Sequence, residues 1–499
     1  MLRISELKLP LDHAPEALAA LIARTLEVPP EAIASHTVYK RSFDARKAEL
    51  LTVYICDVAL ADARLEAALL AKHAGHPHIQ NAPDMRHALP ADVPAGASRP
   101  VVIGFGPCGI FAALMLAQMG LRPIVLERGK TVRQRTKDTW GLWRKSVLDP
   151  ESNVQFGEGG AGTFSDGKLY SQIKDPRFLG RKVMEEFVKA GAPPEILYVA
   201  HPHIGTFKLV KVVENIREQI VALGGEIRFE QRVTDVRIED GHDGKHLRGL
   251  TVLDQATGQS HELRADHVVM ALGHSSRDTF AMLHERGVHI EAKPFSIGFR
   301  VEHPQGLIDR ARWGRHAGHP MLGAADYKLV HHASNGRSVY SFCMCPGGTV
   351  VAATSEPGRV VTNGMSQYSR AERNANAGIV VGIDPRDYPE GPLAGIALQR
   401  ALESNAFVLG GGDYRAPGQL VGDFIAGKPS TQLGEVMPSY KPGVTPTDLH
   451  RALPDFAIEA MREAFPAFGR KIKGFDLHDA VLTGCLLYTS DAADDTPCV

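Results

Sequence analysis

A glycine motif between a predicted strand and a predicted helix constrains the fold more than any other feature of this sequence. The motif G-x-G-x-x-G spans Gly104–Gly109; it follows the short apolar segment Val101–Ile103 and precedes the Ala-rich helical segment Ile110–Met119. A second apolar segment, Ile124–Leu126, ends at Glu127. Short all-apolar strands are typical of parallel sheets that are covered on both faces. The pattern therefore predicts a β-α-β unit of a dinucleotide-binding sheet.

Each of the three glycines of this motif has a separate physical role. Gly104 permits the tight turn, Gly106 lets the backbone approach a pyrophosphate, and Gly109 allows the helix to pack closely on the strand. The helix N-terminus offers unpaired N–H groups to the phosphates. Glu127, 18 residues after Gly109, is positioned to accept hydrogen bonds from a ribose diol, and an acid there disfavours a 2′-phosphate.

FAD and NAD share the ADP moiety that such a motif binds, so the motif alone leaves both cofactors open. Two further segments favour FAD. Asn153–Tyr170 contains five glycines, and such a loop can lie against a flat ligand. Leu263–His274 is an apolar strand that ends in Gly273, similar to the Ala-Thr-Gly strand of flavoproteins with two dinucleotide-binding domains.

Several longer stretches carry a family resemblance. They are YKRSFDARK (Tyr39–Lys47), NVQFGEGGAGTFSDGKL (Asn153–Leu169), PHIGTFKL (Pro202–Leu209), GHSSRDTF (Gly273–Phe280) and CMCPGGTVVAATSE (Cys343–Glu356), in addition to the glycine motif. With them, the chain resembles bacterial FAD-dependent dehydrogenases, a family of uncharacterised NAD(P)/FAD-dependent oxidoreductases. The resemblance implies FAD as cofactor and an α/β, two-dinucleotide-binding-domain flavoprotein fold, Rossmann-like in its FAD/NAD(P)-binding part. It also implies an inserted α+β domain, and it supplies no substrate.

The candidate cofactor-binding residues come from the motif, the acid that follows it, the glycine-rich loop and the end of the later strand. They are Gly104, Gly106, Pro107, Cys108, Gly109, Glu127, Arg128, Gly159, Gly160, Gly162 and Gly273. No catalytic residue is assigned and no metal site is expected, because the histidine-rich segment Lys72–His78 has no carboxylate or cysteine partners in its sequence.

Other polar groups allow two interpretations each. Asp166 and Lys168 suit either an acid–base pair beside the flavin or a structural ion pair. Among the arginines after Glu127, one of Arg128, Arg133 and Arg135 is a candidate contact of the cofactor phosphates. Cys343 and Cys345 form C-x-C, which on a regular strand places both thiols on one face, but buried cysteines more often serve as small hydrophobic residues.

The sequence predicts an N-terminal ferredoxin-like α+β domain over residues 1–90, in the order β-α-β-β-α with a last strand near His78. A Pro- and Ala-rich linker over 91–99 leads to the FAD-binding domain over 100–280. Residues 281–484 form the inserted C-terminal, substrate-binding domain.

The last fifteen residues, 485–499, read CLLYTSDAADDTPCV and resemble the translation of a sequencing adapter. Segments of this kind are left out of fold reasoning. We therefore expect a non-native tail without packing partners, and a chain truncated after Gly484. Members of the family that the chain resembles usually end with a further glycine-rich stretch, and the tail puts the presence of that stretch here in doubt.

Charge and composition limit the partners. The chain has 56 basic and 57 acidic residues, so neither a nucleic acid nor a membrane surface is expected to bind it. Six cysteines in 499 residues are typical of a reduced cytoplasmic protein. The function that follows is an FAD-dependent oxidoreductase exchanging a hydride between flavin and a small organic substrate. Its electron partner stays open, with NAD(P)H one alternative, as does its oligomeric state. The alternative functions are a flavin-dependent RNA-modifying protein and a flavin-binding module without turnover.

Overall fold

A computed structural model of the protein describes residues 1–46, 49–90, 93, 96–170 and 173–488. The chain divides into two compact units. The first joins Met1–Ala88 to Lys168–Ile204, and the second joins Leu89–Gly167 to Gly205–Val499. The division at residues 88 and 89 lies two residues before the end predicted for the N-terminal domain, and the segment 168–204, from the predicted FAD-binding domain, belongs to the same unit as the N-terminal residues.

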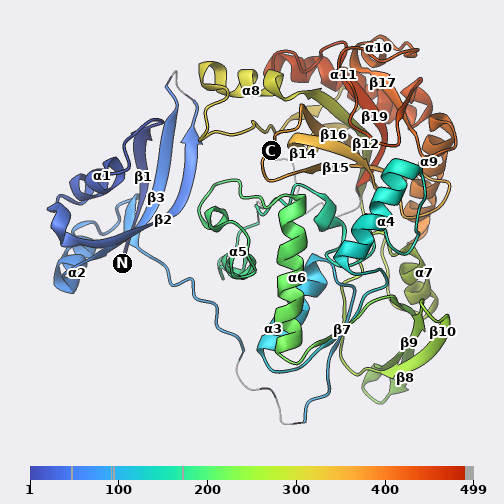
Figure 1. The fold of residues 1–499 in the computed structure, drawn as a ribbon, viewed down its shortest axis with the longest axis horizontal. Helices are drawn as coiled ribbons and strands as arrows, with labels where there is room; N and C mark the ends of the chain where they lie inside the picture. Colours follow the sequence, from blue (N-terminus) through green and yellow to red (C-terminus); the bar gives the residue numbers. More distant parts are fainter. Residues whose placement is uncertain (47–48, 91–92, 94–95, 171–172, 489–499) are drawn as a thin grey trace. The chain divides into compact units, whose positions relative to one another are not determined.

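The first unit contains a four-stranded antiparallel sheet with strand order β2-β3-β1-β4. Its elements follow the β-α-β-β-α order expected from the sequence, with a last short strand: β1 Leu2–Pro10, α1 Ala17–Leu26, β2 Ile33–Asp44, β3 Leu51–Leu60, α2 Ala63–Lys72 and β4 Ile79–Asn81. Apolar residues alternate along β1 and β3 and face both helices, which lie on one side of the sheet (Figure 1). The later segment of this unit adds α5, Leu179–Lys189.

The second unit begins with the parallel sheet that the glycine motif predicts. Its strand order is β11-β5-β6-β7, and every pair is parallel. The elements are β5 Val101–Ile103, α3 Pro107–Gln118, β6 Ile124–Leu126, α4 Val132–Lys145, α6 Thr206–Ala222, β7 Glu226–Arg228 and β11 Val268–Met270. All residues of β5 and β6 are buried, as their apolar sequences require.

A three-stranded antiparallel sheet lies between β7 and β11 in the sequence. It has the order β10-β9-β8, with β8 Gln231–Gly241, β9 Gly244–Asp254 and β10 Gln259–Arg264. Its buried residues share one hydrophobic cluster with β5, β6 and Leu283. Leu283 belongs to α7, Arg277–Glu285, so this helix also packs against the strands.

The rest of the second unit is built on an eight-stranded sheet. Its order is β13-β14-β16-β12-β19-β17-β18, and β15 pairs with β14. The strands are β12 Phe295–Pro304, β13 Val330–His332, β14 Ser338–Ala352, β15 Thr362–Ser366, β16 Asn374–Ile383, β17 Ala416–Leu420, β18 Val444–Pro446 and β19 Val481–Tyr488. The helices are α8 Gln305–Trp313, α9 Ala394–Gly410, α10 Val421–Ala426 and α11 Asp455–Lys471.

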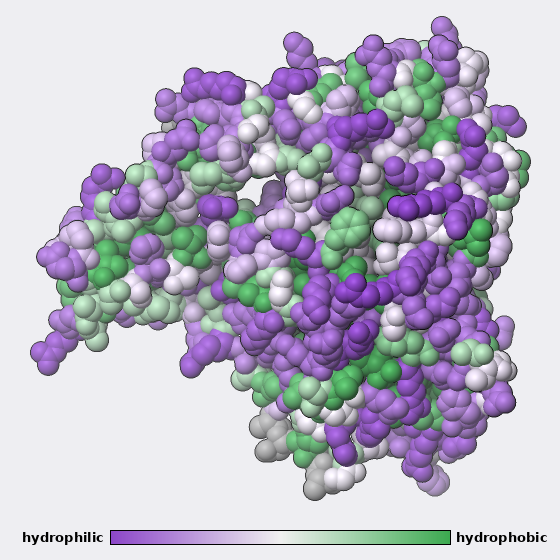
Figure 2. Space-filling model, viewed as in Figure 1, coloured by the Kyte–Doolittle hydropathy of each residue, from purple (hydrophilic) through white to green (hydrophobic). Residues whose placement is uncertain are grey.

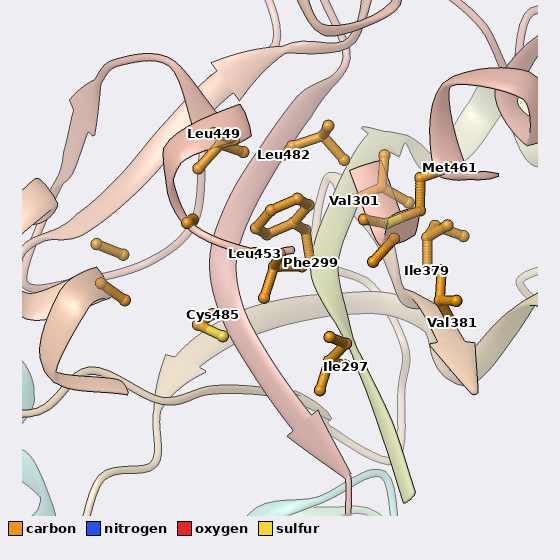
Figure 3. Close-up of a cluster of buried hydrophobic side chains, with 14 of the residues drawn as sticks. Ile297, Phe299, Val301, Ile379, Val381, Leu449, Leu453, Met461, Leu482 and Cys485 are labelled. Atoms are coloured by element: carbon orange, nitrogen blue, oxygen red, sulfur yellow. The ribbon is translucent and has the colours of Figure 1, made fainter. Parts of the chain in front are cut away.

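One face of this sheet forms the largest hydrophobic core of the second unit. Figure 3 shows Ile297, Phe299 and Val301 of β12 beside Met461 of α11 and Cys485 of β19. The alternate residues of β12 point to the opposite face, because successive side chains of a strand alternate. That face carries Arg300 and Glu302, both fully buried.

The expectation that Cys485 begins a tail without packing partners is wrong. Cys485 is fully buried in this core, and β19 pairs with β12 as far as Tyr488. The physical reason is that β19 lies between β12 and β17, where both of its edges form backbone hydrogen bonds and its apolar side chains fill the core. Residues 489–499, the rest of the predicted tail, lie outside the described residues.

Hydrophilic residues cover much of the face shown in Figure 2, with hydrophobic residues in smaller patches between them. Within the part of the chain that the structure describes, no helix is both long enough and apolar enough to cross a bilayer.

Candidate cofactor-binding site

A cavity of about 520 Å³ opens beside the carboxyl ends of β5, β6 and β11. This is where ligands bind in parallel α/β sheets, and the size is typical of a small-molecule site. Of the residues predicted to bind the cofactor, those that line the cavity are Gly104, Gly106, Pro107, Cys108, Glu127, Arg128, Gly160, Gly162 and Gly273. The other two, Gly109 and Gly159, are not among the residues that line the cavity.

The three glycines of the motif meet different surroundings. Gly104 has φ +94°, and a Cβ built on it would lie 2.3 Å from the carbonyl oxygen of Ala271. A Cβ on Gly109 would lie 1.9 Å from the carbonyl oxygen of Gly104. A Cβ on Gly106 would be in ordinary contact, 3.5 Å from Gly160 Cα. Gly104 and Gly109 are therefore required by the fold itself, whereas Gly106 leaves open a space that faces the cavity.

The carboxylate of Glu127 joins the glycine motif to the glycine-rich loop. Its Oε2 accepts a hydrogen bond from Phe105 N at 2.8 Å. Its Oε1 accepts from Gly129 N at 2.8 Å and from Gly157 N at 2.9 Å. A carboxylate offers about four acceptor positions, so one remains for a ligand hydroxyl. The side chain is buried and lines the cavity, which is the geometry that a ribose contact requires.

The glycine-rich loop is held in place by Arg135, a residue of α4 that is fully buried. Its guanidinium donates to the carbonyl oxygens of four loop residues: Asn153 at 2.7 Å, Val154 at 2.6 Å, Gly157 at 3.2 Å and Glu158 at 2.7 Å. Burial lowers the pKa of Arg135 to about 10, so the group is still charged at neutral pH. Arg135 is thus a structural residue of the loop and not a phosphate contact.

A second buried side chain, Glu158, fixes the same loop to α4. Its Oε2 accepts from Val132 N, in the first turn of α4, at 2.7 Å. The Arg217 guanidinium donates to both carboxylate oxygens, at 3.0 and 2.8 Å. Desolvation raises the pKa of Glu158, and these hydrogen bonds and charges oppose that rise. A carboxylate at a helix N-terminus is favourable for the helix dipole.

The remaining arginines after Glu127 are held by carboxylates. Arg128 lines the cavity, but its guanidinium donates to Glu151 at 2.9 and 3.0 Å and to Asp278 at 2.9 Å, and it lies 4.0 Å from the centre of the Phe156 ring. The side chain of Arg133 is 67% exposed and pairs with Glu214. Of the three arginines, Arg128 alone is in a position to contact a ligand in this cavity.

A polar network that the sequence does not reveal lies beyond Gly273. His274 lines the cavity, where desolvation and, as a smaller cause, the nearby charge of Arg277 lower the pKa of its imidazole. Arg277 itself donates to Glu403 at 2.9 and 2.6 Å and to Glu356 at 3.0 Å. These partners are 79 and 126 residues away in the sequence, so no local pattern could have identified them.

Other sequence candidates have ordinary structural partners. Asp166 is buried and forms an ion pair with Arg370, which favours the structural interpretation of this aspartate. Lys168 belongs to the first unit, where it forms an isolated bridge with His203. Neither residue lines the cavity.

The C-x-C pair does not lie on a regular strand. The register of β14 against β16 shifts on both sides of Cys345, and Cys343 has φ +41°. The expected shared face is therefore not formed. Cys345 is buried, and its Sγ donates to the carbonyl oxygen of Cys343 at 3.4 Å. Among the described residues, no group of three or more His, Cys, Asp or Glu could hold a metal ion.

Comparison with known proteins places the chain in a family. A family model described as "FAD-dependent protein, C-terminal domain-like" matches residues 294–487, and a domain of unknown function matches residues 1–59. An uncharacterized protein of Clostridium beijerinckii is 44% identical over 492 residues, which cover 98% of this chain and 90% of that protein. The chain belongs to the family of this clostridial protein. The family match reaches residue 487 and so includes β19, beyond the point where we expected native sequence to end.

Solved structures are less similar to this chain than the clostridial protein is in sequence identity. The FAD complex of glycerol-3-phosphate dehydrogenase from Bacillus halodurans is 14% identical, with 62% of this chain and 53% of that chain covered and a TM-score of 0.29. The 3-ketosteroid-Δ4-(5α)-dehydrogenase from Rhodococcus jostii is 13% identical, with 49% and 66% covered and a TM-score of 0.28. The alignments thus span about half to two thirds of those chains.

The residues of the cavity fit FAD. The space at Gly106 beside the N-terminus of α3 suits a pyrophosphate, and the remaining acceptor position of Glu127 suits a ribose hydroxyl. With the FAD-dependent family match, the cofactor of this protein is FAD.

Proposed function

We propose that the protein is an FAD-dependent oxidoreductase that exchanges a hydride between the flavin and a small organic substrate, with a second partner restoring the flavin. The observation that carries the proposal is the position of Glu127. Its carboxylate lines a cavity at the end of the parallel sheet and is oriented there by three backbone N–H groups. The cytoplasmic location and the identity of both partners stay predictions.

The chain's own residues bind and orient the cofactor. The N–H groups at the start of α3 and the space at Gly106 take the phosphates. Glu127 takes a ribose hydroxyl, and its charge disfavours a 2′-phosphate. Arg135 and Glu158 keep the glycine-rich loop closed against the motif, with Gly159 N donating to Phe105 O at 2.8 Å. When bound, FAD supplies a hydride acceptor and donor, which the protein side chains do not provide.

His274 is the titratable residue at the wall of the cavity beyond Gly273. Desolvation and the nearby charge of Arg277 lower the pKa of its imidazole and favour its neutral form, which can hydrogen-bond without adding a positive charge. Arg277, three residues further on, is held in one orientation by ion pairs with Glu403 and Glu356. This arrangement suits recognition of a polar ligand group at the wall of the cavity.

The proposal is tested with the full chain reconstituted with FAD. Anaerobic mixing with a library of small organic metabolites should bleach the bound flavin with at least one donor, and NADH and NADPH are included as separate probes. The Gly106→Val chain, in which the side chain enters the phosphate space, is the matched control. Stoichiometric FAD that no donor reduces would instead support a flavin-binding module without turnover. Failure of the chain to bind FAD would overturn the site as well.

A further inference from the structure

The first unit contains a second groove, separate from the chemistry proposed for FAD. Its volume is about 790 Å³, within the range of small-molecule sites. All of its lining residues belong to the first unit, on β2 and on the segment 168–204. The proposed redox function does not use this groove.

The groove has a defined frame of backbone hydrogen bonds. The segment 198–200 pairs with the edge strand β2, with Arg41 N donating to Tyr198 O at 2.6 Å and Ala200 N donating to Arg41 O at 2.9 Å. On the other side, Arg181 of α5 donates to Leu197 O at 2.7 Å. The chain over residues 197–200 is therefore hydrogen-bonded to α5 at Leu197 and to β2 at Tyr198 and Ala200.

Aromatic rings supply much of the wall. Four of them line the groove: Tyr39, Tyr170, Phe178 and Tyr198. The guanidinium of Arg3 lies 3.6 Å from the centre of the Tyr39 ring, and the ring of Tyr170 stacks on His201 at 4.5 Å with an interplanar angle of 19°. These contacts hold the rings of Tyr39 and Tyr170 in place. Flat rings held in this way are suited to stacking with a planar ligand.

The charged side chains of the groove are mainly basic. Lys40, Lys174 and Arg177 line it and are exposed, whereas Arg181, which also lines it, is paired with Glu185 at 3.1 Å. Among the described lining residues, Asp175 is the one carboxylate, and it accepts a hydrogen bond of 2.7 Å from Gly180 N, in the first turn of α5. Positive side chains thus outnumber carboxylates in the groove, and the carboxylate of Asp175 is already hydrogen-bonded at the N-terminus of α5. This balance of charge favours an anionic ligand.

We propose that this groove binds a nucleotide, with the planar base against the aromatic wall and the phosphate at the exposed cations. Planar stacking surfaces and phosphate-binding cations within one groove match both halves of such a ligand. A mononucleotide is favoured over a nucleic acid strand because the groove is limited in volume and the chain as a whole carries equal numbers of basic and acidic residues, to within one.

The experiment uses the full chain already saturated with FAD, so that the probe does not compete for the ADP half of the flavin cavity. The probe is a fluorescent adenosine monophosphate, displaced by unlabelled AMP. Lys174→Ala combined with Arg177→Ala should weaken binding by about tenfold or more through loss of phosphate contacts. Tyr170→Leu should weaken it by about fivefold or more, the lower range for a lost base stack, and Tyr170→Phe should retain it.

Two controls separate this groove from the fold and from the flavin site. Arg64→Ala removes an exposed cation on α2 of the same unit, outside the groove, and should leave AMP binding unchanged. FAD content is measured for every variant and should equal that of the parent chain, so that failure of the groove proposal leaves the flavin proposal standing.

Three results would overturn the proposal. The first is no displaceable AMP binding by the FAD-loaded chain. The second is equal binding of inorganic pyrophosphate and AMP with no effect of Tyr170→Leu, which would indicate an anion site without base stacking. The third is a single-stranded oligonucleotide that binds far more tightly than AMP and displaces it, which would indicate a nucleic acid surface.

Discussion

The backbone N–H of Gly157 donates a hydrogen bond of 2.9 Å to Oε1 of Glu127, which joins two segments 30 residues apart in the sequence. The same carboxylate holds Phe105, within the glycine motif. Glu127 therefore fixes the positions of both walls of the cavity relative to each other, in addition to its expected role toward a ribose. Because of this dual role, substitution of Glu127 should affect folding and FAD binding together, whereas substitution of Gly106 should affect FAD binding alone.

Substitution of Gly106 should remove FAD without unfolding the chain. The Cβ of a new side chain meets only ordinary contacts, whereas the rest of a valine extends into the cavity that it lines. Gly106→Val should lower FAD affinity by roughly tenfold or more, because it blocks close approach of the pyrophosphate. Flavin absorbance after gel filtration and the thermal midpoint of the FAD-free chain are the measurements.

Gly109→Ala is the matched comparison for that variant. Its Cβ would lie 1.9 Å from a backbone oxygen, so the helix or the strand must move. This variant should lower the thermal midpoint even without FAD. Equal thermal midpoints for FAD-free Gly106→Val and Gly109→Ala would contradict the difference that the structure shows between the two glycines.

Glu127→Gln should impair both folding and FAD binding. Both carboxylate oxygens accept backbone N–H groups, so the amide NH₂ of glutamine must face a donor in either orientation. The glutamine NH₂ and the backbone N–H that faces it would then both lack an acceptor. This should lower the free energy of unfolding of the FAD-free chain by about 1–3 kcal/mol. Urea denaturation measures this, with Glu285→Gln, on an exposed position of α7, as control. Wild-type stability in Glu127→Gln would contradict the hydrogen-bond pattern.

Arg135→Lys should loosen the glycine-rich loop although it preserves the charge. A lysine ammonium cannot reproduce the planar set of donors that reaches four carbonyl oxygens. We expect faster proteolysis within residues 153–167 and roughly tenfold weaker FAD binding, the effect of losing a few net hydrogen bonds. Arg133→Lys, two residues away and mostly exposed, is the control and should behave as wild type. Identical proteolysis of the two variants would count against this role of Arg135.

His303 should make the stability of the chain depend on pH. It is fully buried, its Nε2–H donates to Phe475 O at 2.7 Å, and burial lowers its pKa from 6.5 to about 4. The unfolded chain binds a proton at this residue below pH 6.5, and the folded chain does so only near pH 4. Stability therefore falls as pH decreases through this window, by roughly 3 kcal/mol for this group.

The measurement is urea denaturation at pH 7 and pH 4.5 with His303→Gln, which keeps a donor but does not titrate. The loss of stability between the two pH values should be smaller in His303→Gln than in wild type. His332→Gln, on an exposed position of β13, should retain the wild-type loss. The same loss in all three chains would show that His303 titrates alike in the folded and unfolded states.

Local sequence patterns were enough to predict the core of the cofactor site. The apolar strands β5 and β6, the turn at Gly104 and the acid at the end of β6 are each specified within about thirty residues, because strand, turn and helix chemistry is local. The β-α-β-β-α order of the N-terminal elements followed for the same reason.

The sequence did not predict which distant segments complete these structures. Arg135 reads as one of several arginines on a polar helix, and only the fold shows that it is buried beneath the glycine-rich loop. The attachment of residues 198–200 to β2 and the pairing of Arg277 with Glu403 are of the same kind. Cys485 was misassigned because its sequence context was atypical, while its burial depends on β12.

The amino-acid sequence by itself therefore determined the dinucleotide-binding unit, its glycine and acid residues, and the choice of FAD. These depend on backbone conformations and side chains that neighbours along the chain specify. Only the tertiary structure decided which buried charges hold the loop, where the second groove lies and how far the C-terminal strand extends. Those features depend on contacts between residues far apart in the sequence, whose pairing is fixed by packing and by the need of buried polar groups for partners.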